Sequence, residues 1–297
     1  MKESFKILVY FVALIVLGAL LAPFLFWAGQ WLGARVPSLK VLDTSEFQRY
    51  FNRSVLIAAL VLLWPMIRWM RIPGWQALGL RRDPEGLRHW LTGFGLAFAV
   101  MAALAAGLTA SGIWDWKNPL PWHRLTSVFV TAAVVPVIEQ FFFNGALLGL
   151  ISRTANRWVS LAVVSAIYAI VHFLKPREVM IHDAQVTWLS GFHFIPYVFD
   201  RFSHPELVLA GFTSLFVLGW TFGYAAQQTR ALALGMGLHA GIVLAKFSFT
   251  KLAKPDRKID AMPWFGSELE FGIGSVLVLI ILFFLVWSVL RSKSRAF

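Results

Sequence analysis

The chain has 297 residues, of which 58% are hydrophobic and only 14% are charged, and it has a formal net charge of +12 and no cysteine. Soluble domains usually carry about 25% charged residues, so this composition excludes an ordinary soluble enzyme, a disordered chain and a coiled coil. The lack of cysteine excludes disulfides, thiolate metal sites and cysteine nucleophiles. We therefore expect an all-α, polytopic membrane protein whose positive charge faces anionic lipid headgroups rather than nucleic acid.

Long apolar stretches predict about eight transmembrane helices in one bundle, since a helix needs about 20 apolar residues to cross the hydrocarbon layer. In chain order, the predicted spans are Ile7–Ala28, Val55–Trp69, Leu91–Gly112, Thr126–Ile151, Trp158–Leu174, Leu207–Ala226, Ala231–Phe247 and Phe271–Leu290. We expect the first to be an uncleaved helix, because its apolar run is longer than that of a signal peptide. No repeat or low-complexity linker divides the sequence, which predicts a single transmembrane domain over residues 1–297.

Three connecting segments have a distinctive composition. Trp75–Leu80, before the third predicted span, is typical of an interfacial stretch anchored by a tryptophan. The longest segment, Lys175–Pro205, is expected to lie in the interface or to re-enter the membrane, since it is rich in aromatic residues, namely Trp188, Phe192, Phe194, Tyr197 and Phe199. The basic run Lys251–Lys258 is expected to be a solvated loop.

Charge alone does not fix the orientation in the membrane, because Lys and Arg are almost equally numerous on the two sides of the predicted bundle. With eight spans, both termini lie on one side. We expect that side to be cytoplasmic, since its loops are shorter and the positive-inside rule weights short loops more strongly. The expected location is a bacterial-type inner or cell membrane.

Three titratable side chains stand within the predicted spans, where a charged group costs at least about 2.5–3.5 kcal/mol to insert. Glu139 lies near the middle of the fourth span, His172 near the end of the fifth and His239 inside the seventh. Either histidine alone is explained by a hydrogen bond between helices, and Glu139 alone by a protonated structural acid. One carboxyl and two imidazoles on three helices together indicate a shared reactive centre.

These residue types allow two kinds of chemistry. In the first, Glu139 is a general base that takes a proton from water, His172 holds that water or shares its proton, and His239 donates to the developing oxyanion. In the second, the same three side chains bind a catalytic zinc ion with an open fourth position, although without the His-Glu-x-x-His spacing. The residues by themselves leave both alternatives open.

Glycine and proline positions predict the packing around these side chains. Glycines four residues apart let transmembrane helices approach closely. Such pairs are Gly145 with Gly149, Gly219 with Gly223, and Gly237 with Gly241, the last of which flanks His239. Pro136, one turn before Glu139, is expected to free a backbone carbonyl and to kink the helix beside the site.

Three short motifs in this order resemble those of the CPBP family of intramembrane proteases, also called the Abi or CAAX-protease family. The family motifs are Glu-Glu-x-x-x-Arg, Phe-x-x-x-His and His-x-x-x-Asn, and here the matching segments are Glu139–Asn144, Tyr168–His172 and His239–Val243. The resemblance covers about residues 78–247, including the Leu78-Gly79-Leu80 stretch. It implies an eight-helix intramembrane endopeptidase in which Glu139 activates water and His172 and His239 assist. The prenyl endopeptidase branch further implies a glutamate mechanism without a metal.

The chain departs from these motifs at Gln140, Asn144 and Val243, where the family has Glu, Arg and Asn. Gln140 and Asn144 together predict a neutral amide pair, four residues apart, in place of an ion pair. Val243 removes a candidate oxyanion donor.

The function predicted from the sequence is hydrolysis of a peptide bond in a membrane-tethered peptide or protein, with membrane lipid as a partner and no nucleic acid. No cofactor is expected to be required, and zinc held by Glu139, His172 and His239 is the alternative. The motif departures motivate a second hypothesis, a non-catalytic scaffold or binding protein of the same fold. A third is a proton-coupled carrier, since Glu and His in helices also form proton relays, although the sequence shows no inverted repeat.

Overall fold

The computed structural model describes residues 3–43, 45–72, 74, 76, 81–174, 186–203, 205–256, 261–266, 269 and 272–294. These residues form the all-α structure that was expected, and they also form one short two-stranded ladder. They group into two compact units, Met1–Ile72 with Val171–Val208, and Pro73–Ile170 with Leu209–Phe297. Most of the predicted interfacial stretch Trp75–Leu80, and residues 175–185 of the longest predicted loop, lie outside the described residues. The prediction of a single domain stays a prediction.

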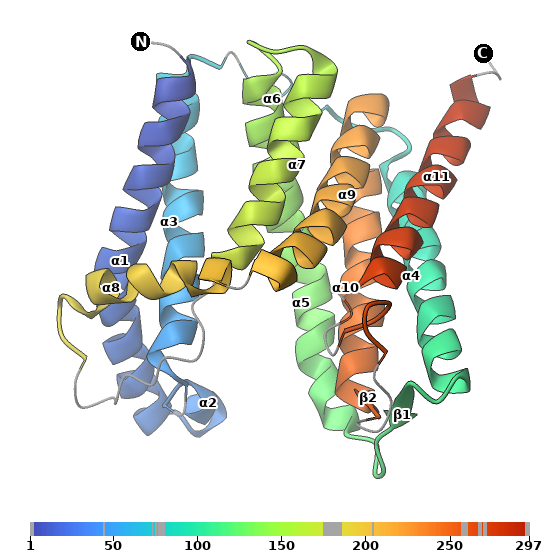
Figure 1. The fold of residues 1–297 in the computed structure, drawn as a ribbon. Coiled ribbons are helices and arrows are strands. Elements are labelled where there is room, and N and C mark those ends of the chain that lie inside the picture. The colour runs from blue at the N-terminus through green and yellow to red at the C-terminus, as the bar shows by residue number, and fades with distance from the viewer. Residues whose placement is uncertain are drawn as a thin grey trace. The chain divides into compact units, whose positions relative to one another are not determined.

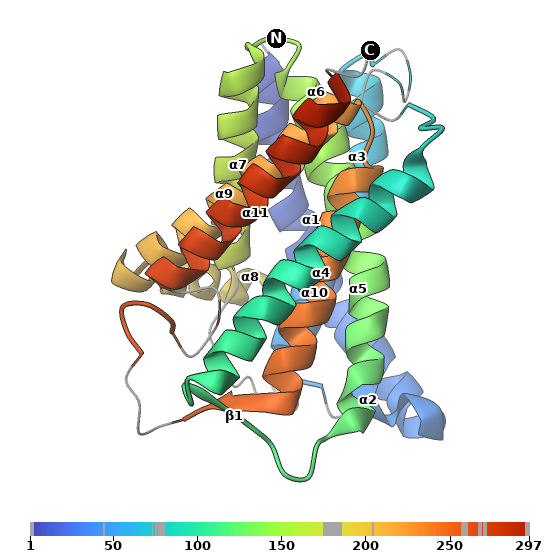
Figure 2. The ribbon, with the colours of Figure 1, turned by 90° about the vertical axis from the view of Figure 1, so that its right-hand side faces the viewer.

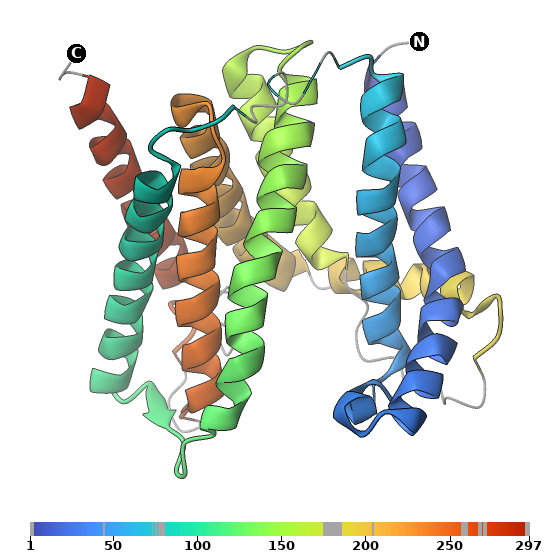
Figure 3. The same cartoon turned by 180° about the vertical axis from the view of Figure 1, so that it is seen from behind.

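The first unit is built on a helix pair. Helix α1 (Glu3–Arg35) packs along α3 (Phe47–Trp69), and α2 (Lys40–Asp43) lies between them in the chain, as Figure 3 shows. The two helices approach closely at Gly18, where an added Cβ would lie 2.7 Å from Val55 Cγ2. There the Ser54 hydroxyl donates to the Gly18 carbonyl at 2.6 Å. Buried aromatic rings, among them Phe26 and Phe47, fill the adjoining core.

A short helical segment lies across this pair in the first unit. It comprises α8 (Ser190–Phe194) and the 3-10 helix η6 (Pro196–Ser203), drawn in yellow in Figure 1. Gly191 lies against the carbonyl of Ala19, near the middle of the 33-residue α1, so closely that an added Cβ would overlap it. Phe194 is fully buried against Phe47 and Phe51. Contact with the middle of α1 favours the re-entrant alternative for this segment, because such backbone is tolerated at membrane depth where protein covers it.

The second unit holds most of the helices. They are α4 (Gly86–Ala110), α5 (Leu125–Glu139), α6 (Leu148–Ile151), α10 (Ala233–Leu252), α11 (Ile273–Ser294) and most of α7 (Arg157–Phe173) and α9 (Pro205–Thr229). Helix α10 packs along α4 and also contacts α5. Figure 2 shows α4 and α10 crossing side by side. This arrangement makes α10, which carries His239, the central helix of the unit.

Glycines allow the close approach of α10 to α4. An added Cβ at Gly241 would lie 2.6 Å from the carbonyl oxygen of Phe94, and one at Gly237 would overlap the carbonyl oxygen of Trp90. On the other side of the contact, Gly93 lies against the carbonyl of Leu234 in the same way. The close packing predicted from Gly237 and Gly241 is therefore present on both sides of His239.

Substituting Gly237 by Val is expected to destabilise the protein by about 1–3 kcal/mol or more. The added side chain would clash with backbone atoms of α4, which cannot move aside as a flexible side chain can. Thermal unfolding of the purified protein in detergent measures this loss. Gly95→Ala is the matched control, since Gly95 is on α4 with nothing within 4 Å of an added Cβ. We expect that variant to be as stable as the wild type or more so. Equal melting temperatures for both variants would contradict the packing account.

A two-stranded antiparallel ladder closes one end of this unit, where β1 (Trp114–Trp116) pairs with β2 (Ala253–Pro255). The Lys117 ammonium donates to the carbonyls of Thr250 and Lys251 at the end of α10. Desolvation and the nearby charges of Arg124, Lys251 and Lys254 lower the pKa of Lys117. The interpretation of Lys251–Lys258 as a solvated loop was therefore wrong for its first residues, which belong to α10 and β2 because the ladder and the Trp114–Phe249 ring contact hold them.

Within the part of the chain that the structure describes, six helices are long and apolar enough to cross a membrane. They are Phe5–Arg35, Phe47–Trp69, Gly86–Ala110, Trp122–Ile151, Ala233–Leu252 and Ile273–Arg291. The chain is thus an integral membrane protein, but the count of about eight spans is not confirmed. The fifth predicted span is α7, whose 17 residues reach about 25 Å against a hydrocarbon layer of about 30 Å. The sixth lies within α9, which is not among the six.

Candidate functional site

The helix that carries Glu139 changes its geometry at this residue. Helix α5 ends at Glu139 and continues as a π-helical segment, η4 (Gln140–Leu147), before α6. Pro136, one turn earlier, has no backbone N–H, so it removes one helical hydrogen bond next to the transition. A π-helical segment within an α-helix is rare and frequently marks a functional site. The kink expected at Pro136 stays a prediction, and the π-helical segment was not predicted from the sequence.

Glu139 and His239 meet across two helices of the second unit. Nε2 of His239 on α10 lies 3.9 Å from Oε2 of Glu139 at the end of α5. The His239 side chain is 6% exposed and that of Glu139 is 22% exposed, and Oε2 of Glu139 itself is buried. The imidazole stacks on Phe222 of α9, with ring centroids 5.0 Å apart and planes at 24°, which fixes its orientation. One water molecule can bridge polar groups at this separation.

A third helix orients the carboxyl of Glu139. The Tyr168 hydroxyl on α7 forms a side-chain hydrogen bond with Glu139. Tyr168 is 2% exposed, and its ring packs edge-on against Phe143 at 5.0 Å. The sequence analysis gave Tyr168 no role. The available signal was the hydroxyl that it adds where the resembling motif has Phe, because a buried Tyr hydroxyl usually finds a partner.

The predicted amide pair is present in the π-helical segment. The Asn144 side-chain amide donates to Oε1 of Gln140 at 2.8 Å, and both side chains are almost fully buried. Gly235 and Gly223 make room for them, since added Cβ atoms would lie 2.7 Å from Gln140 Oε1 and 3.1 Å from Asn144 Oδ1. A neutral pair thus stands where the resembling motif has Glu and Arg, and it depends on glycine at positions 223 and 235.

The other predicted positions are placed as follows. His172 is in the last turn of α7, one turn after Tyr168, and its segment groups with the first unit whereas Glu139 and His239 belong to the second. The role predicted for His172 stays a prediction. Val243 is buried on α10 one turn after His239, and its side chain has no hydrogen-bond donor. Of the three predicted site residues, the structure brings together Glu139 and His239.

The zinc alternative requires three protein ligands around an open position. Among the described residues, no three His, Asp or Glu side chains are grouped closely enough to hold a metal ion. Glu139 and His239 supply two such groups, and the Glu139 carboxylate already accepts a hydrogen bond from the Tyr168 hydroxyl. The observed donor set fits a carboxylate–imidazole pair better than a zinc site, and no step below is routed through a metal.

Part of the chain matches a known protein family. Residues 121–245, which include Glu139, Tyr168 and His239, match the model described as type II CAAX prenyl endopeptidase Rce1-like. No curated protein and no solved structure matched the chain.

Proposed function

Because residues 121–245 form a domain of the Rce1-like type II CAAX prenyl endopeptidase family, we propose that the chain is an intramembrane endopeptidase that hydrolyses a peptide bond of a membrane-associated substrate. The observation that carries the proposal is the contact of Glu139 with His239 at 3.9 Å within this domain. A carboxyl and an imidazole from different helices, both shielded by apolar side chains, are suited to general acid–base chemistry.

In the proposed reaction, the Glu139 carboxylate takes a proton from a water molecule as its oxygen attacks the carbonyl carbon of the substrate. His239 donates a hydrogen bond to the oxygen on which negative charge develops. The C–N bond then breaks, and the protonated Glu139 returns its proton to the leaving amine. Water is consumed, a carboxyl and an amine are formed, and Glu139 is regenerated.

Two further side chains complete the proposal. Tyr168 is a positioning residue, because its hydroxyl bonds to the Glu139 carboxylate and orients it. His172, one turn further along α7, is proposed to hold the attacking water. No metal is proposed to be required. We further propose that both termini are cytoplasmic, in a bacterial-type inner or cell membrane.

The substrate is proposed to be a tethered peptide, since the site belongs to a helical bundle that spans the membrane. The test uses two fluorogenic peptides of one sequence, one bearing a lipid anchor and one without it, and the chain reconstituted in proteoliposomes. We expect the anchored peptide to be cleaved with the higher kcat/KM. Equal cleavage of the peptide without an anchor would contradict the requirement for membrane tethering. Failure to cleave any anchored peptide, whatever its sequence, would contradict the proposed peptidase activity.

Replacing Tyr168 by Phe is expected to lower kcat by about 10- to 100-fold with little change in KM, because a hydrogen bond to a charged group contributes about 1.5–3 kcal/mol. Steady-state rates on the anchored peptide measure this. Tyr224→Phe is the matched control, because Tyr224 is also buried but packs on Phe283. If both variants kept wild-type rates, Tyr168 would not position Glu139.

A further inference from the structure

A small cavity opens at one end of the second unit. Its volume is about 240 Å³, and its lining includes Arg81, Asn144, Ser152, Gln227 and Arg230. Ligand sites for whole small molecules usually occupy about 300–1,000 Å³, so this cavity suits one polar group of a larger molecule. Neither Glu139 nor His239 lines it.

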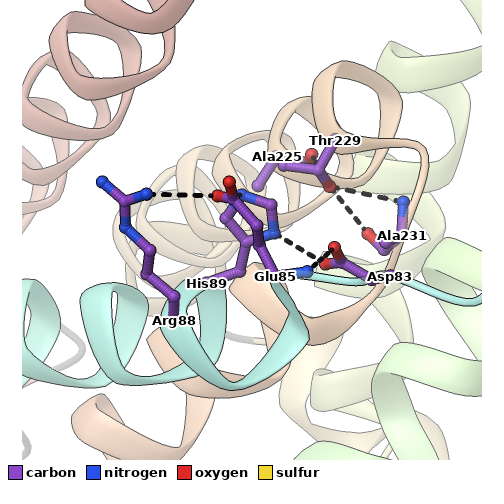
Figure 4. Close-up of polar contacts among 7 residues, drawn as sticks. All are labelled: Asp83, Glu85, Arg88, His89, Ala225, Thr229 and Ala231. Carbon is purple, nitrogen blue, oxygen red and sulfur yellow. Dashed lines mark hydrogen bonds and ion pairs between the residues drawn. The ribbon is translucent and has the colours of Figure 1, made fainter.

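The charged side chains that line the cavity are both basic, namely Arg81 and Arg230. The nearest acids along the chain have other partners, as Figure 4 shows. Asp83 Oδ2 lies 2.6 Å from His89 Nδ1 and Glu85 lies 3.5 Å from Arg88, while Asp83 also accepts the backbone N–H of Glu85. In the described part of the chain, neither Arg81 nor Arg230 forms an ion pair. Two guanidinium groups from different loops favour an anion with several oxygens.

Two of the residues that line the cavity carry buried amide oxygens. Asn144 is 4% exposed, and its Oδ1 has no hydrogen-bond partner among the described residues. The same is true of Oε1 of Gln227, whose Nε2 donates to the Arg157 carbonyl at 3.0 Å. Both oxygens are buried, so they belong to the wall of the cavity rather than to its open surface. Asn144, which stands where the resembling motif has Arg, is one of the polar residues that line the cavity.

The cavity lies where helices of the unit begin or end. Helix α4 begins at Gly86, α6 ends at Ile151, α9 ends at Thr229 and α10 begins at Ala233, at the upper end of the unit in Figure 1. In a chain that spans the membrane, helix ends lie near the headgroups. Arg157 at the start of α7 lies 4.6 Å from the ring of Trp158, a pairing of residue types common at the membrane interface.

We propose that this cavity binds a phosphate group supplied by the headgroup of a membrane lipid such as phosphatidylglycerol. Arg81 and Arg230 bind the phosphate oxygens, and the polar side chains of Asn144, Ser152 and Gln227 line the cavity beside them. Free dihydrogen phosphate offers the same chemistry. The proposal is independent of peptide hydrolysis.

Titration of phosphatidylglycerol into the purified full-length protein in detergent, followed by native mass spectrometry, tests this site. We expect one tightly bound lipid, and a loss of affinity of about tenfold or more in the Arg81→Gln/Arg230→Gln double variant. Ser152→Glu places a negative charge at the exposed rim of the cavity and is expected to weaken binding similarly. The Arg88→Gln/Arg291→Gln double variant removes the same charge outside the cavity and is expected to keep the tight site. The melting temperature of each variant is measured as well, so that a loss of lipid binding is distinguished from a loss of folding.

Competition distinguishes the possible sources of the anion. Displacement of the lipid by millimolar inorganic phosphate would assign the phosphate group itself as the ligand, and no displacement would assign the lipid headgroup; both support the site. The proposal would be overturned if lipid affinity fell equally in the cavity double variant and in the control double variant. It would also be overturned if the cavity variants folded and bound the lipid as tightly as the wild type. Displacement by a peptide with a free C-terminal carboxylate, but by neither its amidated twin nor phosphate, would also overturn it.

Discussion

Replacing Glu139 by Gln is expected to lower kcat for an anchored peptide about 10³-fold, within the range that general acid–base groups contribute. Gln has nearly the same shape as Glu and still accepts a hydrogen bond from Tyr168, so the fold and KM are expected to change little. What Gln lacks is the ability to take a proton from water. Initial rates in proteoliposomes, with the melting temperature measured in parallel, test this expectation.

The matched control is Glu85→Gln, the same chemical change at a half-exposed side chain that lies 3.5 Å from the exposed Arg88 and 3.7 Å from Nε2 of His89. Surface ion pairs of this kind contribute about 0–1 kcal/mol, so we expect nearly wild-type activity and stability. A folded Glu139→Gln variant with undiminished turnover would remove Glu139 from the mechanism. A folded Glu139→Gln variant that cleaves nothing, yet replaces the wild-type protein fully in cells that lack it, would favour the scaffold hypothesis over the peptidase.

Replacing His239 by Ala is expected to lower kcat about 10²–10³-fold, the usual effect of removing one donor to a developing oxyanion. Because this donor acts in the transition state, kcat and kcat/KM are expected to fall by similar factors. His239→Gln retains an N–H donor and is expected to recover part of the loss. Separate determination of kcat and KM for both variants is the measurement.

His193→Ala is the control for this prediction, since His193 is an exposed histidine on α8. The loss of packing against Phe222 is assessed from the melting temperature of His239→Ala, because truncation of a stacked, buried ring also costs stability. A rise in KM alone would show that His239 binds the substrate equally in the ground and transition states, against the role proposed here.

The contact between Glu139 and His239 was predictable because each of these residues is expensive in an apolar helix unless a partner shares the cost. The same reasoning held for Gln140 and Asn144, whose polar groups pair locally, four residues apart. Local spacing and insertion cost are properties of the sequence itself. For this reason both contacts follow from the residue types.

Other features depend on three-dimensional packing that hydropathy does not encode. The hydrogen bond of Tyr168 to Glu139 joins α7 to α5, and nothing in the apolar pattern around Tyr168 specifies it. The contact of α8 with the middle of α1 depends on Gly191 meeting the Ala19 backbone, which periodicity does not reveal. The number of spans was uncertain for a related reason, because the 17-residue α7 is apolar like a span but shorter than the usual length.

The central claim is that water activated by Glu139 hydrolyses the peptide bond, and the most direct test is cleavage of an anchored peptide in oxygen-18-labelled water, in the presence of a strong chelator, with mass analysis of the products. We predict one labelled oxygen in the new carboxyl group for the wild-type protein and no product above background for Glu139→Gln. Equal product from both proteins, or wild-type cleavage that stops with the chelator and returns with zinc, would contradict the account.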